Sequence, residues 1–449
     1  MLCMLCLSAN LTNADEVRGG WVTAWNKGLF TPSEADATIA AAKKAGLNTL
    51  FVQVRKVGDA YYESSIEPRG DNIVPGFDPL AYMIEKGHAN GIRIHAWVNV
   101  CRVWREKTLP ADISHIVTRY PEWLSREYDG SSHAEDGMFM DPGVPDAREY
   151  TASLIADIAK RYDLDGIHLD YIRYPDSKWG YSDIALARYK AETGVSDKPE
   201  PGDSDWVCWR MKQVTELVKL IRSRVHAVKP NVTITAATIA WGDCKPTFTD
   251  NAACKRTCQD WCGWLAGGLI DAAVPMNYRR ESKADMAAQF RLWLKGFAKW
   301  GGGKPTYVGI DLHNNSTSNI LRQIAAVRKA GLQGYVLFSF NDFPVRDSIV
   351  AALAKQPGAS SNVECSTSAQ FFDKGIHCAE ANQLGMAKVY LKKAIELDPN
   401  YIEAHFRLGR VYLREKNYTM AQQEFEATLQ LDPSHAGAKS ELDGLAFRE

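Results

Sequence analysis

The segment DGIHLDYIRYP, residues 165–175, combines the pattern of a β-strand with side chains capable of acid–base chemistry. Alternate residues of a strand share a face. One face of this segment is apolar or aromatic, whereas the other carries His168 and then Asp170, with Arg173 just beyond the strand end. An unpaired buried carboxylate costs on the order of several kcal/mol. The pattern therefore predicts either a catalytic role for Asp170 or an ion pair with Arg173 or Arg55.

The elements around this segment predict an α/β fold of the (β/α)8 TIM-barrel type. Strand-like and helix-like stretches alternate from residue 18 to about residue 355, which indicates a parallel sheet. The eight strand candidates are residues 19–25, 49–54, 93–100, 166–172, 232–239, 272–278, 306–313 and 334–340. An open doubly wound sheet is the alternative, but no glycine-rich phosphate turn follows the first candidate. In a barrel, His168 and Asp170 point into the lumen, and Asp170 lies near the end that carries active sites.

The C-terminal part of the chain contains a repeat. Gly375, Ala387, Asp398 and Pro399 recur 34 positions later, and this period resembles that of tetratricopeptide repeats, which are paired helices. We therefore expect a small all-α domain after the barrel, either as a structural cap or as a module that binds a protein or peptide. The predicted boundaries are a leader at 1–16, the barrel at 17–355, a linker at 356–368 and the repeats at 369–449.

The composition of the 449 residues restricts the environment and partners of the protein. The first residues, MLCMLCLSAN, resemble the rear half of a secretion signal, so we expect export to the periplasm, cell envelope or medium. No later stretch is apolar enough to span a bilayer. The net charge of −1, without a basic block, argues against nucleic acid as a partner.

The cysteines form a second pattern. Cys254, Cys258 and Cys262 are spaced C-x3-C-x3-C, which would place their sulfurs on one face of a helix, and Cys244 lies nearby. An even set of cysteines in an exported protein favours a disulfide-stapled insertion. Free thiols and a metal site are the alternatives, although the spacing departs from the usual zinc patterns.

DGIHLDYIRYP is similar to the DGhhhDdYhYP signature of the family-10-like glycosyl hydrolases, which are related to glycosidases that cleave peptide-free peptidoglycan strands. The segments RGGWVTAW, VQVRKVGDAYYESSIEP, HAWVNVCRV, FMDPGVPDAREY and PMNY extend the resemblance over residues 17–355. Two departures stand out. Tyr171 occupies a position where the family often has a second acid, and the related chitinase motif DGhDhDhE would need acids at His168 and Ile172.

The resemblance implies a sugar-binding cleft lined by polar and aromatic groups. The implied residues are Arg55, Asp59, Tyr61, Asn99, Arg102, Asp141, Asp170, Arg173, Tyr174, Asn277 and Tyr278. Trp241 would add an aromatic face, and His168 could hydrogen-bond near Asp170 and tune its pKa.

Glycoside hydrolysis usually uses two carboxyl groups. We expect Asp170 to be the general acid, and Asp311, near the end of the seventh strand, is the candidate base or nucleophile. Loop acids remain alternatives, namely Asp59, Glu67, Asp141 and Asp342. If the sugar carries an N-acetyl group, that group could be the nucleophile, and Asp170 would then need only an orienting partner such as Asn277 or Tyr278.

The predicted function is hydrolysis of an N-acetylated cell-wall polysaccharide, with peptidoglycan glycan strands as the first choice and no cofactor or metal. One alternative is a non-catalytic glycan-binding barrel whose repeats recruit a partner. Another is a hydrolase of an exopolysaccharide or of a plant or host glycan. A metal-dependent deacetylase is disfavoured because its ligand set is missing: His88, His95, His168 and His313 are scattered singly.

Overall fold

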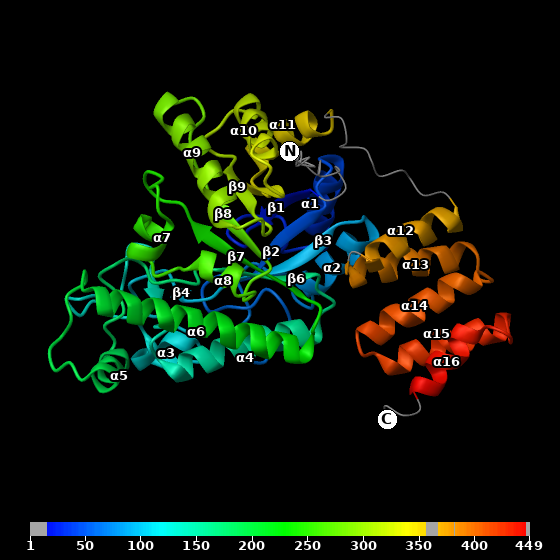
Figure 1. Ribbon diagram of the computed structural model, residues 1–449, viewed down its shortest axis with the longest axis horizontal. Helices are drawn as coiled ribbons and strands as arrows, with labels where there is room; N and C mark the ends of the chain where they lie inside the picture. Colours follow the sequence, from blue (N-terminus) through cyan, green and yellow to red (C-terminus); the bar gives the residue numbers. More distant parts are fainter. Residues whose placement is uncertain (1–15, 356–366, 381, 446–449) are drawn as a thin grey trace, which may run out of the picture.

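The computed structural model describes residues 16–355, 367–380 and 382–445. Eight parallel strands form a closed barrel in the order β1-β10-β9-β8-β7-β6-β3-β2 (Figure 1). The strands are β1 (Val17–Val22), β2 (Thr49–Arg55), β3 (Arg93–Asn99), β6 (Gly166–Asp170), β7 (Thr233–Ile239), β8 (Ala272–Met276), β9 (Tyr307–Asp311) and β10 (Gly334–Phe338). The predicted barrel is confirmed, and each of the eight strand candidates contributes one strand. The predicted leader, apart from Glu16, and most of the predicted linker lie outside the described residues.

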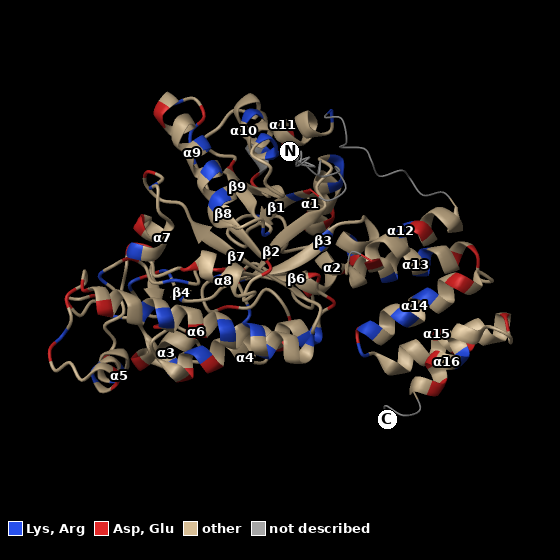
Figure 2. Ribbon diagram, viewed as in Figure 1, with Lys and Arg blue, Asp and Glu red and all other residues tan. Residues whose placement is uncertain are grey.

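Helices connect the strands and cover the outside of the barrel. The larger ones are α1 (Pro32–Lys44), α2 (Pro79–Ala89), α4 (Pro145–Arg161), α5 (Asp183–Thr193), α6 (Ser204–Val228), α9 (Ala284–Trp300), α10 (Thr317–Lys329) and α11 (Phe343–Leu353). The apolar faces of these helices, except α5, pack on the outward side chains of the strands to form the main core. The α5 helix packs instead on α6 in a separate cluster that contains Tyr189 and Trp206. Basic and acidic side chains are mixed over the outer surfaces of the helices (Figure 2).

The lumen is filled by large side chains from alternate strand positions. Trp21, Phe51, Trp97 and Val336 form one buried cluster inside the barrel. His168 lies among them: its Nε2 accepts a hydrogen bond from the indole of Trp21 (3.0 Å), and its Nδ1 lies 2.8 Å from the hydroxyl of Thr235. The barrel is therefore closed below its mouth by packed rings.

The longest connections between barrel strands follow β3 and β6. After β3, the chain forms a two-stranded antiparallel ribbon of β4 (Arg102–Trp104) and β5 (Met138–Phe139), with α3 (Ile116–Arg119) and a 3-10 turn (Pro121–Trp123) between them. In the pairing of β3 with β6, Asn99 lies opposite Asp170. This register places both side chains at the carboxyl end of the barrel.

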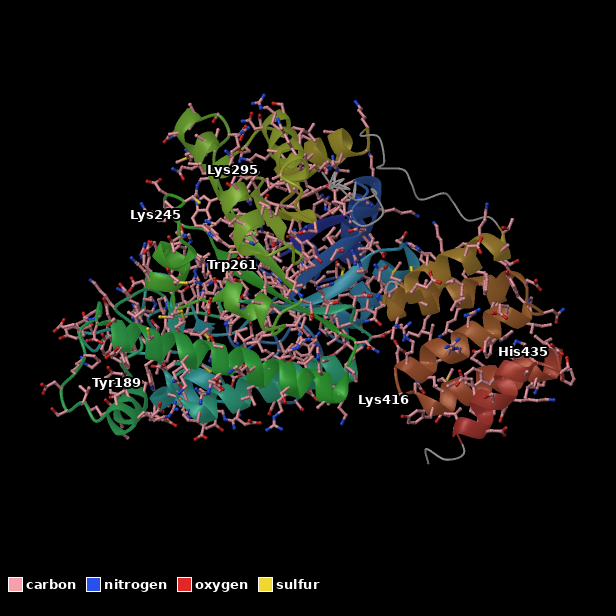
Figure 3. The ribbon with its side chains drawn as sticks, viewed as in Figure 1. Tyr189, Lys245, Trp261, Lys295, Lys416 and His435 are labelled. Atoms are coloured by element: carbon pink, nitrogen blue, oxygen red, sulfur yellow. The ribbon has the colours of Figure 1, made fainter. Side chains whose placement is uncertain are left out.

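The cysteine-containing insertion differs from its prediction. The short helix α7 (Ala252–Lys255) ends before Cys258, which adopts a φ of 58°, and α8 (Trp261–Ala266) begins afterwards. No single helix therefore carries the three cysteines on one face. The buried ring of Trp261 (Figure 3) packs on Phe248, in the 3-10 turn Phe248–Asp250, and helps to hold the insertion together.

The predicted disulfide staple is absent from the described part of the chain. The cysteines described are free thiols, namely Cys101, Cys208, Cys244, Cys254, Cys258, Cys262 and Cys378. The break between α7 and α8 places Cys254 and Cys262 in different helices, with Cys258 between them, so the helical alignment assumed for the three cysteines does not form.

In the described ranges after the barrel, the chain forms five helices: α12 (Ser368–Glu380), α13 (Leu384–Leu397), α14 (Ile402–Arg414), α15 (Tyr418–Leu431) and α16 (Ala436–Leu445). They pack as antiparallel pairs around their own apolar core. The α13 helix contacts α2 beside the amino-terminal end of the barrel (Figure 1). Lys388 of α13 bridges Asp163 of the barrel and Glu415 of the repeats, at 2.9 Å to each. Among the helices of the described ranges, none is long and apolar enough to cross a membrane.

Candidate active site

A cavity of about 220 Å³ opens at the carboxyl ends of the barrel strands. Its lining consists of Trp21, Thr23, Trp25, Gln53, Trp97, Asn99, Arg102, Asp136, Asp170, Tyr171, Arg173, Ile239, Trp241, Met276, Tyr278 and Phe338. The lining combines aromatic surface with a few polar groups that converge from different strands, which is typical of ligand sites. Of the residues predicted for the site, six line this cavity: Asn99, Arg102, Asp170, Arg173, Trp241 and Tyr278.

Asp170 is held at the mouth of the lumen by two neutral donors. Its Oδ1 accepts a hydrogen bond from the backbone N–H of Tyr171 (2.7 Å), and its Oδ2 accepts one from the indole of Trp97 (3.1 Å). Only 6% of the residue is exposed. Burial raises the pKa of the Asp170 carboxyl above its ordinary value, and the nearby donors and guanidinium groups only partly oppose this rise. A carboxyl that keeps its proton at higher pH is suited to general acid catalysis.

The backbone beside Asp170 is strained. Tyr171 adopts a φ of 49°, in the left-handed region that a residue with a Cβ rarely occupies, at a cost of about 1 kcal/mol. Its ring lies beneath the guanidinium groups of Arg102 (5.2 Å) and Arg173 (4.7 Å). The turn therefore presents an aromatic ring and two cations next to the acid. Such strain is concentrated at functional sites.

Asp136 is the second carboxylate in the cavity. It lies on the loop between β4 and β5, its side chain is 48% exposed, and its Oδ2 is 3.6 Å from Nη2 of Arg173. Asp136 was not singled out from the sequence, because no strand pattern marks an acid in the middle of a long loop. Its place in the site comes from the β4–β5 ribbon, which folds that loop over the mouth.

Asp311, predicted as the second catalytic carboxylate, ends β9 but does not line the cavity. Its Oδ1 accepts a hydrogen bond from the N–H of His313 (2.9 Å), and its Oδ2 accepts one from the Asn314 amide (2.6 Å). Both oxygens are therefore engaged by their own turn.

Burial raises the pKa of the Tyr278 hydroxyl, and the negative charges of Asp170 and Asp311 raise it further. Tyr278 thus lies within electrostatic reach of both acids.

Arg55 and His168 differ most from the predicted cleft lining. Arg55 is fully buried in an ion pair with Glu67 (2.6 Å) and donates to the carbonyl oxygens of Asn99 and Val100, so it supports the end of β3. This pairing also removes Glu67 from the candidate acids. His168 is sealed within the lumen, and burial lowers the pKa of its imidazole well below the ordinary value. His168 is packed among the rings of Trp21, Phe51 and Trp97, whereas the guanidinium of Arg55 is held by Glu67.

The remaining predicted residues support loops. Asp59 accepts backbone hydrogen bonds within its own turn and pairs with Lys56 (3.8 Å), while Tyr61 is buried near the same lysine. Tyr174 donates its hydroxyl to the buried Asp141 (2.9 Å), which joins the loops after β5 and β6.

Asn277 also supports the fold and lies outside the cavity lining. It follows β8 between two lining residues, Met276 and Tyr278, and therefore points the other way, toward α9, where its amide donates to Phe290 (3.2 Å). Strand alternation accounts for its exclusion.

The aromatic lining was only partly predicted from the sequence. Trp21, Thr23 and Trp25 occupy alternate positions along β1 and its extension, and all three face the cavity. This alternation was visible in the segment WVTAW and could have identified them. Trp25 lies at the rim, with 40% of its surface exposed, and Tyr278 stacks on Phe338 at 5.3 Å. These rings offer flat apolar surfaces around the acid.

The described ranges of the chain contain no cluster of side chains that could ligate a metal ion. No group of three or more His, Cys, Asp or Glu side chains there is arranged to hold a metal ion. The polar groups of the cavity are instead carboxylates, guanidinium groups and amides.

The closed barrel and its mouth define an architecture shared with glycoside hydrolases. The glycoside hydrolase domain of PgaB (BpsB) from Bordetella bronchiseptica superimposes with a TM-score of 0.56 at 14% identity, over 76% of this chain and 100% of that domain. At this identity, the likeness supports the fold alone.

The sequence model of the Glycosyl hydrolase-like 10 family matches residues 16–311, and the chain therefore belongs to that family. Tetratricopeptide-repeat models match residues 378–401 and 390–423, which confirms the repeat prediction. Glycosyl hydrolase YngK of Bacillus subtilis (strain 168) is 28% identical over 396 residues, covering 78% of this chain and 74% of YngK. Glycosyl hydrolase DigH of Escherichia coli (strain K12) is 27% identical over 290 residues, covering 60% of this chain and 63% of DigH.

Proposed function

We propose that the protein is an exported glycoside hydrolase that cleaves glycan strands of the bacterial cell wall, with peptide-free peptidoglycan as the preferred substrate. The observation that carries the proposal is the carboxyl of Asp170, whose pKa is raised by burial, at the mouth of an aromatic-lined barrel. Membership of the Glycosyl hydrolase-like 10 family supports it. Export brings the enzyme to its substrate, and the tetratricopeptide repeats bind a protein or peptide partner.

In the proposed mechanism, Asp170 donates its proton to the glycosidic oxygen as the bond to the leaving sugar breaks. Asp136, the other carboxylate of the cavity, is the base or nucleophile, because it is half-exposed and lies opposite Arg173. Asp311 is the competing candidate, with both oxygens already bonded in its own turn. Aromatic rings such as Trp25 and Trp241 hold the sugar faces.

The second carboxylate is identified by comparing Asp136→Asn with Asp311→Asn. Loss of about 10²-fold or more in kcat for one variant assigns the role to that residue. If both variants keep their activity, the nucleophile is the acetamido oxygen of an N-acetylated sugar. The anomeric configuration of the wild-type product distinguishes a carboxylate nucleophile from a base, since a covalent intermediate gives retention and direct attack by water gives inversion.

The decisive experiment digests purified peptide-free glycan strands and determines the masses of the products. We expect wild-type protein to release shorter saccharides and Asp170→Asn to be about 10²- to 10⁴-fold slower. Chitin oligosaccharides and cellulose serve as comparison substrates. Binding of the strands without any cleavage would instead favour the non-catalytic glycan-binding barrel, and cleavage by Asp170→Asn at the wild-type rate would remove Asp170 from the mechanism.

A further inference from the structure

The rim of the cavity carries a buried cation, Arg102, for which the described residues provide no acidic partner. Arg102 begins β4 and is only 8% exposed. Its Nε donates to the carbonyl oxygen of Asp136 at 2.7 Å, while the described part of the chain offers its two terminal nitrogens neither a hydrogen bond nor an acidic side chain at ion-pair distance. The remaining contacts of the guanidinium are with the rings of Trp25 (5.5 Å) and Tyr171 (5.2 Å).

The neighbouring charges make this arrangement unusual. The cavity lining contains two arginines, Arg102 and Arg173, and two acids, Asp136 and Asp170. Asp136 lies 3.6 Å from Arg173. Asp170 lies in the same cavity, and its oxygens accept hydrogen bonds from the N–H of Tyr171 and the indole of Trp97. Within the described residues, Arg102 therefore has no acidic side chain at ion-pair distance.

Other rim cations do not share this property. Lys56 lies 4.6 Å from the ring centre of Trp25 and is paired with Asp59. Arg105 lies 5.2 Å from the same ring, but its side chain is 62% exposed and is paired with Glu106. Trp25 is thus surrounded by three cations, of which Arg102 alone, within the described residues, is both buried and without an acidic partner.

We propose that Arg102 and the ring of Trp25 form a subsite for a sugar that carries a carboxylate. A guanidinium with two free N–H edges binds a carboxylate through paired hydrogen bonds, and burial strengthens this interaction. The adjacent exposed ring packs against the face of the same sugar. The inference rests on the proposed function and deepens it, because it names the chemical class of the sugar bound beside Asp170. A lactyl ether carboxylate and a uronic acid carboxylate share this chemistry.

The test measures binding in the Asp170→Asn background, in which the ligand is not consumed. Three probes are titrated by calorimetry: peptide-free glycan strands with free lactyl carboxylates, the same strands after methyl esterification, and hyaluronan oligosaccharides, which carry uronic acids. We expect esterification to weaken binding about 10- to 100-fold. Adding Arg102→Met should weaken binding of the free-acid strands by a similar factor and leave the esterified strands unaffected within about threefold.

Two further variants test whether the effect on binding is specific to the guanidinium of Arg102. Arg105→Met removes a nearby exposed cation and should change affinity by less than about threefold. Arg102→Lys keeps the charge but loses the paired hydrogen bonds, and it should lie between wild type and Arg102→Met. It also gives a result if Arg102→Met folds poorly. The acidic probe whose binding depends on residue 102 identifies the source of the carboxylate.

Equal affinity for free-acid and esterified strands would overturn the subsite. So would equal losses from Arg102→Met and Arg105→Met, or failure of both acidic probes to bind. Absence of hydrolysis by wild-type protein, with the binding pattern intact, would instead count against the proposed function and leave the subsite standing.

Discussion

Asp165 and Asp170 lie at opposite ends of the same strand, and their surroundings give them opposite properties. At the amino-terminal end, Oδ2 of Asp165 is 2.7 Å from Nε2 of His88 and accepts the N–H of Ile94 (2.8 Å). Burial alone would raise the pKa of this carboxyl, but the charge and hydrogen bond of His88 lower it. Asp170 has only neutral donors at hydrogen-bond distance, and burial raises its pKa.

Both carboxyls are buried, so the opposite shifts of their pKa values come from the groups that contact them. The repeats pack against the amino-terminal end: Gly385 of α13 approaches so closely that a Cβ there would lie 3.1 Å from His88 and 3.2 Å from Asp165. Both ends border a cavity, one of about 470 Å³ between the barrel and the repeats and one of about 220 Å³ at the carboxyl-terminal end. The two ends differ in the groups beside the acid, since Asp165 is paired with His88 whereas Asp170 accepts from the N–H of Tyr171 and the indole of Trp97.

The largest expected effect is that one variant loses activity while the other loses stability. Asp170→Asn should lower kcat on glycan strands by about 10²- to 10⁴-fold and change the free energy of unfolding by no more than about 1 kcal/mol. Asp165→Asn should cost about 3 kcal/mol of stability, because it breaks a buried pair, while the folded fraction keeps its kcat. Steady-state kinetics and urea unfolding measure the two quantities. A loss of kcat in Asp165→Asn equal to that in Asp170→Asn would remove the contrast.

The second prediction concerns the pH dependence of stability. Burial would lower the pKa of His88, but the carboxylate of Asp165 raises it above the value of the unfolded chain. The stability that this shift contributes is complete below the unfolded pKa of about 6.5 and disappears as the pH rises through the folded pKa. The lowered pKa of Asp165 adds stability above about pH 4 that is lost as the pH falls through its folded pKa. The pair therefore stabilises most between about pH 4 and 6.5.

Unfolding midpoints measured from pH 2 to 9 test this window, and His88→Gln serves as the matched variant. The difference in stability between wild type and His88→Gln should be largest inside the window and smaller on both sides. A difference that does not vary with pH would show that the pair contributes through packing alone.

A smaller effect is expected on the pH profile of activity. Arg173 and, less strongly, Arg102 lower the pKa of Asp170 against the effect of burial. Activity that needs protonated Asp170 falls as the pH rises through this pKa. Arg173→Met should therefore move the alkaline limb of kcat/KM to higher pH, by up to about one pH unit. Arg105→Met is the control, and an alkaline limb that moves equally in both variants would exclude a specific effect of Arg173.

The smallest effect concerns the contact between barrel and repeats. Lys388→Met removes the bridge between Asp163 and Glu415 and should cost about 1 kcal/mol or less, since Asp163 is 42% exposed. Hydrogen exchange along α13 should quicken, while kcat on glycan strands stays unchanged. A fall in kcat would show that the contact at the amino-terminal end of the barrel affects the active site. The two ends would then not act independently.

Much of the scaffold was predictable because strand alternation and helix periodicity are local. The parity of His168 and Asp170 placed both in the lumen, and the 34-residue period identified the repeats. The site was less predictable because residues past strand ends obey no simple period. Asn277 points toward α9 and Arg55 is buried against Glu67, whereas Asp136 reaches the cavity from the middle of a loop.

The amino-acid sequence by itself determined the barrel, the repeats and an acid at the mouth of the fourth barrel strand, because each follows from spacing along one segment. Only the tertiary structure decided which charges face one another. The pairing of Asp165 with His88, the hydrogen bond from Trp97 to Asp170 and the contact of Arg102 with Asp136 join segments far apart in the chain. The proton affinity of a buried acid depends on such neighbours, so its chemistry is defined only once the chain has folded.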